Sequence, residues 1–296
     1  MRKNIFELLS EDFDAAYEIK TIWQLFAREV SINIFNSAGI FIKGPMSILN
    51  FIDSYSFANW KSRNRCVSPL DMMNRLGIDE QLIHNLDTFS DRVLLVLEFI
   101  INMLARYEIA IKNLRYNVNK EYKILKENIN AFIEHFGYEK YSLDEEEQII
   151  LIEKNPAAIS AAEISEPEIA KKIIQYNHYT LKGDIESKKE ILITLANEVE
   201  PRRKELERVN SSLSDDLFFM FNNVNLRHNN IEPNDKNYRP FIADMDKSSL
   251  ESWYDETYQM ILLAKLLLDN VVRTSNIKTL KKNITGTQNE SEAENK

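Results

Sequence analysis

The stretch that decides the fold reads VLLVLEFIINMLARYEIAI and covers residues 93–111. Its apolar residues recur at helical spacing and form a face that is too wide for a helix at the protein surface. The pattern predicts a long helix, opened by Thr88 or Ser90, at the centre of the hydrophobic core. The chain has only 6 glycines and 7 prolines in 296 residues, fewer than folds with many tight turns use. The sequence therefore predicts an all-α protein, an elongated helical bundle.

Regular patterns continue on both sides of this stretch. A stripe of large apolar residues over 12–35 predicts a helix before it, and another pattern that closes at Gly137 predicts a helix after it. The branched run at 149–152 lies between turn signals, and it predicts one small β-hairpin near residues 140–153. After this hairpin the helical spacing returns, and a long helix is expected to close the fold.

The hairpin is also the expected boundary between two regions of the chain. Residues 1–140 are expected to form an amino-terminal helical region, and residues 141–278 a carboxy-terminal helical bundle. Residues 279–296 are polar and carry several glutamates. Because such a segment has too little apolar surface to bury, we expect a disordered acidic tail.

Composition limits the class of protein. Lys and Arg number 37 and Asp and Glu number 46, so the formal net charge is −9. This balance argues against a broadly basic surface for nucleic acids, although a local basic site remains compatible with it. The single cysteine, Cys66, excludes an intramolecular disulfide and a cysteine-based zinc site, which suits a reducing compartment. No apolar run reaches the roughly 20 residues that span a bilayer. We therefore expect a cytoplasmic protein without a membrane segment.

Common catalytic signatures are absent from the sequence. The glycines are too scattered for a phosphate-binding loop, and the 4 histidines do not form a His-Glu-x-x-His pattern. The sequence therefore predicts neither a metal site nor a bound cofactor.

One polar segment differs from the rest of the chain. Residues 222–233 read NNVNLRHNNIEP at the end of an aromatic-rich helix. The guanidinium of Arg227 could hold a phosphate, and the imidazole of His228 could move a proton near neutral pH. Asn223 would lie one helical turn before Arg227. Together these groups could cleave RNA without a metal. The alternative is structural, because Arg, His and Asn also stabilise the end of a helix.

Other polar residues could assist this segment. His178 is a second histidine that could lie across the bundle from His228. Four further residues are candidates for binding an anion, and they lie on both sides of the segment: Arg203, Lys236, Tyr238 and Arg239.

The cytoplasmic all-helical plan, with a late Asn/Arg/His helix end followed by a loop and a long closing helix, resembles the HEPN superfamily. The resemblance covers about the last 130 residues and, loosely, the long helix from Ser90. The family motif is Arg, then four to six residues, then His. Here Arg227 and His228 are adjacent, and positions 232–234 are Glu, Pro and Asn.

The resemblance implies a four- to five-helix bundle that acts as a metal-independent endoribonuclease in bacterial phage defence, abortive infection or a toxin–antitoxin system. It implies RNA as the substrate and either a homodimer or a partner protein from the same operon. The catalytic group would be Arg227 and His228, supported by Asn223 and His178. Two alternatives stay open from the residues themselves. One is a non-catalytic helical interaction or scaffold protein, and the other is a sensor that binds an anion or nucleotide through Lys236, Tyr238 and Arg239.

Overall fold

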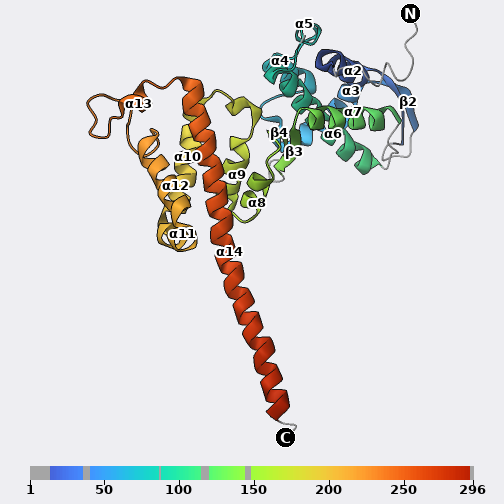
Figure 1. The fold of residues 1–296 in the computed structure, drawn as a ribbon. Helices are drawn as coiled ribbons and strands as arrows, with labels where there is room; N and C mark the ends of the chain where they lie inside the picture. Colours follow the sequence, from blue (N-terminus) through green and yellow to red (C-terminus); the bar gives the residue numbers. More distant parts are fainter. Residues whose placement is uncertain (1–13, 36–40, 87, 115–119, 144–147, 294–296) are drawn as a thin grey trace, which may run out of the picture. The chain divides into compact units, whose positions relative to one another are not determined.

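A computed structural model of the chain describes residues 14–35, 41–86, 88–114, 120–143 and 148–293. The chain forms two compact units, Met1–Lys154 (unit 1) and Asn155–Lys296 (unit 2). Helices make up most of the described residues, together with two short antiparallel hairpins (Figure 1). The all-α fold class expected from the sequence is confirmed.

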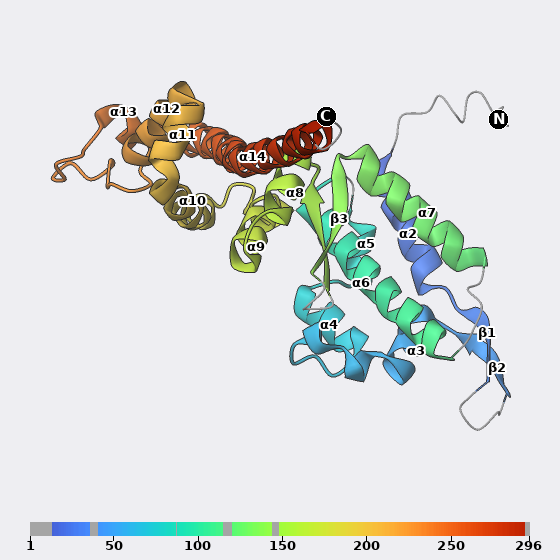
Figure 2. The ribbon, with the colours of Figure 1, turned by 90° about the horizontal axis from the view of Figure 1, so that it is seen from below.

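Unit 1 is built around helix α6. Its elements, in chain order, are α2 (Ala15–Ala27), β1 (Val30–Phe35), β2 (Phe41–Met46), α3 (Ile48–Tyr55), α4 (Pro69–Leu76), α5 (Glu80–His84), α6 (Asp91–Leu114), α7 (Lys120–His135), β3 (Tyr138–Leu143) and β4 (Gln148–Glu153). Helices α2 and α3 and strand β4 contact α6, and α2 also lies against α7 (Figure 2). Residues on several faces of α6, such as Leu94, Val96, Phe99 and Ile101, are buried. The predicted central helix is therefore confirmed.

The predicted hairpin near residues 140–153 is also confirmed, and a second hairpin was not predicted. Strands β3 and β4 pair with Tyr138 opposite Glu153. Strands β1 and β2 pair with Val30 opposite Met46. The expectation of one helix over 12–35 is wrong in its second half, because α2 ends at Ala27. The following sequence, VSINIF, alternates apolar and polar residues, which is the period of a strand.

Two polar side chains of α6 bond to the free edge of β4. Asn102 donates from Nδ2 to the Ile149 carbonyl at 2.6 Å and accepts the Ile149 N–H on Oδ1 at 2.9 Å. The Glu98 carboxylate accepts the Leu151 N–H at 2.8 Å. These side chains bond to backbone groups of β4 that a third strand would otherwise bind. The two-stranded sheet therefore keeps hydrogen-bond partners along the edge that faces α6.

Unit 2 is a bundle of helices packed on one face of α14. Its elements are α8 (Pro156–Glu163), α9 (Pro167–Tyr176), the 3₁₀ turn η4 (Tyr179–Leu181), α10 (Ile185–Val199), α11 (Arg203–Val209), α12 (Ser211–Asn223), α13 (Pro240–Ala243) and α14 (Lys247–Ala293). Polar caps define several starts: Asn155, Asp184 and Asn210 accept backbone N–H groups in the first turns of α8, α10 and α12. Helix α14 runs beside α8, α10 and α12 (Figure 1).

The domain limits differ from those expected. The division follows Lys154 and not residue 140, because β4 packs on α6 and the hairpin belongs to unit 1. The stretch 279–293 was expected to be disordered, yet it continues α14 as far as Ala293, and residues 294–296 lie outside the described ranges. Extending an existing helix costs much less free energy than nucleating a new one, and the stretch contains no proline.

Candidate functional site

The polar segment begins where α12 ends. Helix α12 stops at Asn223, and Asn225 adopts the left-handed conformation with φ of 58°. The Arg227 N–H then bonds back to the Phe221 carbonyl at 3.0 Å. Because Asn tolerates this conformation better than most residues, Asn225 turns the chain at this point. Arg227 therefore lies beyond the helix, and the expectation that Asn223 precedes it by one helical turn is wrong.

The guanidinium of Arg227 is held by aromatic rings and one acid. Its Cζ lies 5.2 Å from the centre of the Phe221 ring and 5.7 Å from that of Phe218. It also forms an ion pair with Glu200, and 18% of the Arg227 side chain is exposed. The group is positioned at the surface of unit 2, and an incoming anion would have to displace Glu200 to bind it.

Arg203 reaches the same aromatic ring from α11. Its Cζ lies 4.4 Å from the centre of the Phe218 ring. Arg203 and Arg227, which sequence analysis assigned to separate roles, are therefore brought together by Phe218. We call Arg203, Arg227 and Phe218 the arginine pair site. Guanidinium groups bind planar oxyanions well because their N–H donors match phosphate and carboxylate oxygens.

His228 follows directly and its side chain is exposed. Among the described residues, no hydrogen bond or ion pair involves its imidazole. The ring is open to solvent, which is compatible either with an unused surface residue or with an acid–base group.

Of the other residues predicted for the site, Arg239 and Asn223 contact each other, whereas His178 has a different partner. Arg239 donates from Nε to the Asn223 amide oxygen at 3.1 Å, so these two candidates meet. Lys236 is exposed and Tyr238 is half-buried. His178 lies between α9 and η4, and its Nδ1 is 2.7 Å from the Thr180 hydroxyl. The structure thus pairs His178 with Thr180 and not with His228.

A buried asparagine orders the loop after α12. Asn230 has no exposed surface. Its amide oxygen accepts the Asn225 N–H at 2.7 Å, and its amide nitrogen donates to the carbonyls of Asn222 and Asn237 at 3.2 and 2.8 Å. Sequence reasoning saw an Asn-rich segment, but nothing in the pattern distinguishes Asn230 from its neighbours.

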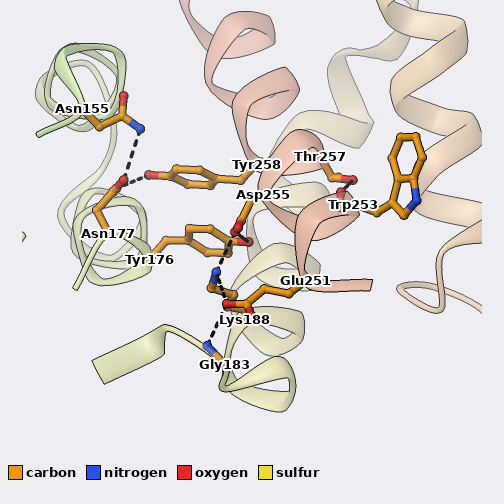
Figure 3. Close-up of polar contacts among 10 residues, drawn as sticks. All are labelled: Asn155, Tyr176, Asn177, Gly183, Lys188, Glu251, Trp253, Asp255, Thr257 and Tyr258. Atoms are coloured by element: carbon orange, nitrogen blue, oxygen red, sulfur yellow. Dashed lines mark hydrogen bonds and ion pairs between the residues drawn. The ribbon is translucent and has the colours of Figure 1, made fainter. Parts of the chain in front are cut away.

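A second polar cluster lies where α14 meets α9 and α10 (Figure 3). The buried ammonium of Lys188 lies 2.7 Å from a carboxylate oxygen of Glu251 and 2.7 Å from one of Asp255. The hydroxyl of Tyr176 donates to Asp255 at 2.9 Å. The rings of Tyr176 and Tyr258 stack with their centres 4.0 Å apart. We call these five residues the Lys188 cluster.

Hydrogen bonds extend this cluster to the start of unit 2. The Asn177 amide donates to the Tyr258 hydroxyl at 2.6 Å, and Asn155 donates to Asn177 at 3.1 Å (Figure 3). Burial raises the pKa of Tyr258 far above the neutral range, so its hydroxyl stays protonated. The cluster consequently holds α14 against α9 and α10. The Tyr176 hydroxyl and the Lys188 ammonium donate hydrogen bonds to Asp255, within the protein.

Sequence reasoning missed the Lys188 cluster. A usable signal was present, because Glu251 and Asp255 are spaced by four residues and share one face of the closing helix. The partner lysine belongs to another helix, and a single sequence does not indicate which of many lysines faces that pair.

Within the described ranges, no group of three or more His, Cys, Asp or Glu residues is placed to hold a metal ion. None of the helices in those ranges combines the length and apolarity needed to cross a bilayer. Comparisons of this chain with protein-family models, with curated proteins and with solved structures found no match.

Proposed function

We propose that this chain is a HEPN-like helical protein whose unit 2 is a metal-independent endoribonuclease, acting in bacterial phage defence or a toxin–antitoxin system. The observation that carries the proposal is the arginine pair site with the exposed His228 directly beside it. Two guanidiniums, one from α11 and one from the segment after α12, share the Phe218 ring, and the exposed His228 follows Arg227 in the sequence. Guanidiniums that can bind phosphate and an imidazole that can transfer a proton are groups suited to cleaving an RNA phosphodiester.

The geometry supports a simple division of roles. A phosphate oxygen would replace the Glu200 carboxylate on Arg227, and the guanidinium would offset the charge that grows on the phosphate. The imidazole of His228 would take the proton of the attacking 2′-hydroxyl or deliver one to the leaving 5′-oxygen. Arg203 would hold a neighbouring phosphate, and Arg239 with Lys236 would extend the basic surface along the strand.

Cleavage of single-stranded RNA tests this proposal. The purified full chain is incubated with fluorescent RNA oligonucleotides of mixed sequence in excess EDTA. We expect cleavage by the wild type and a loss of about 100-fold or more for His228→Ala and Arg227→Ala. His84→Ala and Arg208→Ala serve as matched controls, since both residues are exposed and lie outside the site. Wild-type protein that neither binds nor cleaves RNA would overturn the proposal.

A second candidate, a non-catalytic helical interaction protein, is favoured by the ion pair between Arg227 and Glu200. In this reading Arg227 fastens the end of α12 to the start of η5 (Glu200–Arg202), as Asn230 fastens the following loop. Thermal unfolding separates the two candidates. The interaction reading expects Arg227→Ala to lower stability by about 1 kcal/mol with no cleavage by any variant.

A further inference from the structure

Helix α14 continues well beyond the helices that it packs against in unit 2. Its buried residues include Tyr254, Tyr258 and Ile261, and the last of them is Leu268. Figure 1 shows the helix extending past the ends of α8, α11 and α12 toward the carboxy terminus. From Val272 onward the described side chains are exposed. A single helix without neighbours is marginally stable in water, so this extension calls for a partner.

Four exposed aliphatic residues of α14 fall into a heptad repeat, whereas a fifth, Val272, lies off it. Ile277 and Ile284 are 51% and 54% exposed, and Leu280 between them is 57% exposed. Their spacing of three and four residues places both isoleucines at position a and the leucine at position d. Seven and fourteen residues before Ile277, the a positions are Asn270 and Leu263, and Leu263 is 47% exposed. We call this row of a and d residues, from Leu263 to Ile284, the stripe. The stripe therefore runs from the solvent face of the bundle into the free extension.

The kinds of residue at these positions indicate the partner. β-Branched residues at a combined with Leu at d favour two parallel strands, and a single Asn at a selects pairing in register with an identical Asn. We propose that a second copy of this chain covers the stripe, and that the two α14 helices form a parallel, two-stranded coiled coil in which Asn270 meets Asn270 of the other copy. This proposal is independent of the ribonuclease proposal.

The flanking charges agree with this pairing. In a parallel dimer the g position Asn276 faces the e position Lys281 of the other helix, so no like charges oppose one another there. Arg273 occupies a d position and is the one charged residue of the a and d set between Leu263 and Ile284. Its Nε is held by Asp269 of the same helix at 2.5 Å. Arg273 consequently limits the strength of the dimer.

The size of the stripe sets the expected affinity. From Leu263 to Ile284 the helix is roughly 33 Å long and about 10 Å wide, which gives roughly 330 Å² of face in each copy. Standard stable interfaces use about 800 Å² per partner. We therefore expect a reversible dimer in the micromolar range, visible only when the protein concentration is varied.

Sedimentation equilibrium of the full chain, from low to high micromolar concentration, tests the proposal. We expect a monomer–dimer equilibrium that Ile277→Asp weakens by about 100-fold or more. Arg273→Leu should strengthen the dimer by about tenfold or more. The matched control is Val272→Asp, because Val272 is 51% exposed but lies at position c, off the stripe. A monomer at all concentrations, or a dimer equally sensitive to both Asp variants, would overturn the proposal.

Disulfide trapping tests the orientation of the two helices. In a Cys66→Ser background, a parallel coiled coil brings the two copies of residue 270 together, so Asn270→Cys is expected to form a covalent dimer on mild oxidation. Val272→Cys, at position c and away from the partner, should remain monomeric under the same oxidation when both variants are analysed on a non-reducing gel. Rapid cross-linking of both variants, or of neither, contradicts the parallel arrangement.

Discussion

The Lys188 ammonium on α10 lies 2.7 Å from the Asp255 carboxylate on α14, and only 8% of the lysine side chain is exposed. The same ammonium binds Glu251, which lies one turn earlier on α14. One cation therefore joins two turns of the longest helix to its neighbour. Because a buried charge left without its partners is costly, breaking this contact should weaken the attachment of α14.

Replacing Lys188 by Ala should destabilise unit 2 by about 2–3 kcal/mol. Breaking a fully buried ion pair costs about 3–5 kcal/mol, and the cost is smaller here because Asp255 is about half exposed. The measurement is hydrogen exchange of the α10 and α14 amides in the full chain. The neighbouring Lys189→Ala is the control, with an expected change within about 0.5 kcal/mol. Equal protection in both variants would show that the ion pair contributes little.

Acid should loosen the same contact. Burial alone would raise the pKa of Glu251, but the hydrogen bonds from Lys188 and from the Gly183 N–H, with the charge of Lys188, lower it below its ordinary value of 4.5. The folded state therefore binds this proton less readily than the unfolded state, and stability is present above about pH 4.5. It decreases as the pH falls through the lowered value.

Urea unfolding between pH 3 and 7 checks this dependence. The wild type should lose stability below about pH 4.5, and Glu251→Gln should start less stable at pH 7 and fall less steeply. Asp184, Glu205 and Asp246 also have lowered pKa values, so the variant should flatten the profile only in part. An identical slope in the two proteins would exclude Glu251 as a contributor.

Removing the Asn230 amide should open the loop after α12. Asn230→Ala leaves the Asn225 N–H and the carbonyls of Asn222 and Asn237 without this buried partner, at a cost of about 2–3 kcal/mol. Hydrogen exchange of the Asn225 amide should accelerate strongly. Asn234→Ala, at an exposed position of the same loop, should leave that rate unchanged. A slow Asn225 amide in both variants would contradict the assigned role.

The bond between α6 and the β4 edge should require both ends of the Asn102 amide. In Asn102→Asp the side chain can still accept the Ile149 N–H, but it can no longer donate to the Ile149 carbonyl. We expect a loss of about 1–2 kcal/mol and faster exchange of the β4 amides. Asn50→Ala is the control, because Asn50 is exposed and lies on α3. A hairpin that tolerates Asp at 102 would show that the donor is dispensable.

Features that repeat along the chain could be predicted from the sequence. The wide apolar face at 93–111 identified the central helix α6, because helical period and burial are both visible in neighbouring residues. The branched run at 149–152 identified the β3–β4 hairpin. Alternation over 30–35 was equally visible, but its apolar residues also fit the preceding helical stripe, and the strand was missed. The Arg/His segment after α12 was found through its composition.

Only the tertiary structure decided which distant residues meet. Arg203 and Arg227 share the Phe218 ring, and Lys188 faces Glu251 and Asp255, although nothing near these residues in the sequence indicates their partners. Local periodicity reports the side of an element that is buried, and it contains no information about the element that packs against that side. Contacts between residues far apart in the sequence depend on how the helices pack together. That packing decides which charges meet in the arginine pair site and in the Lys188 cluster.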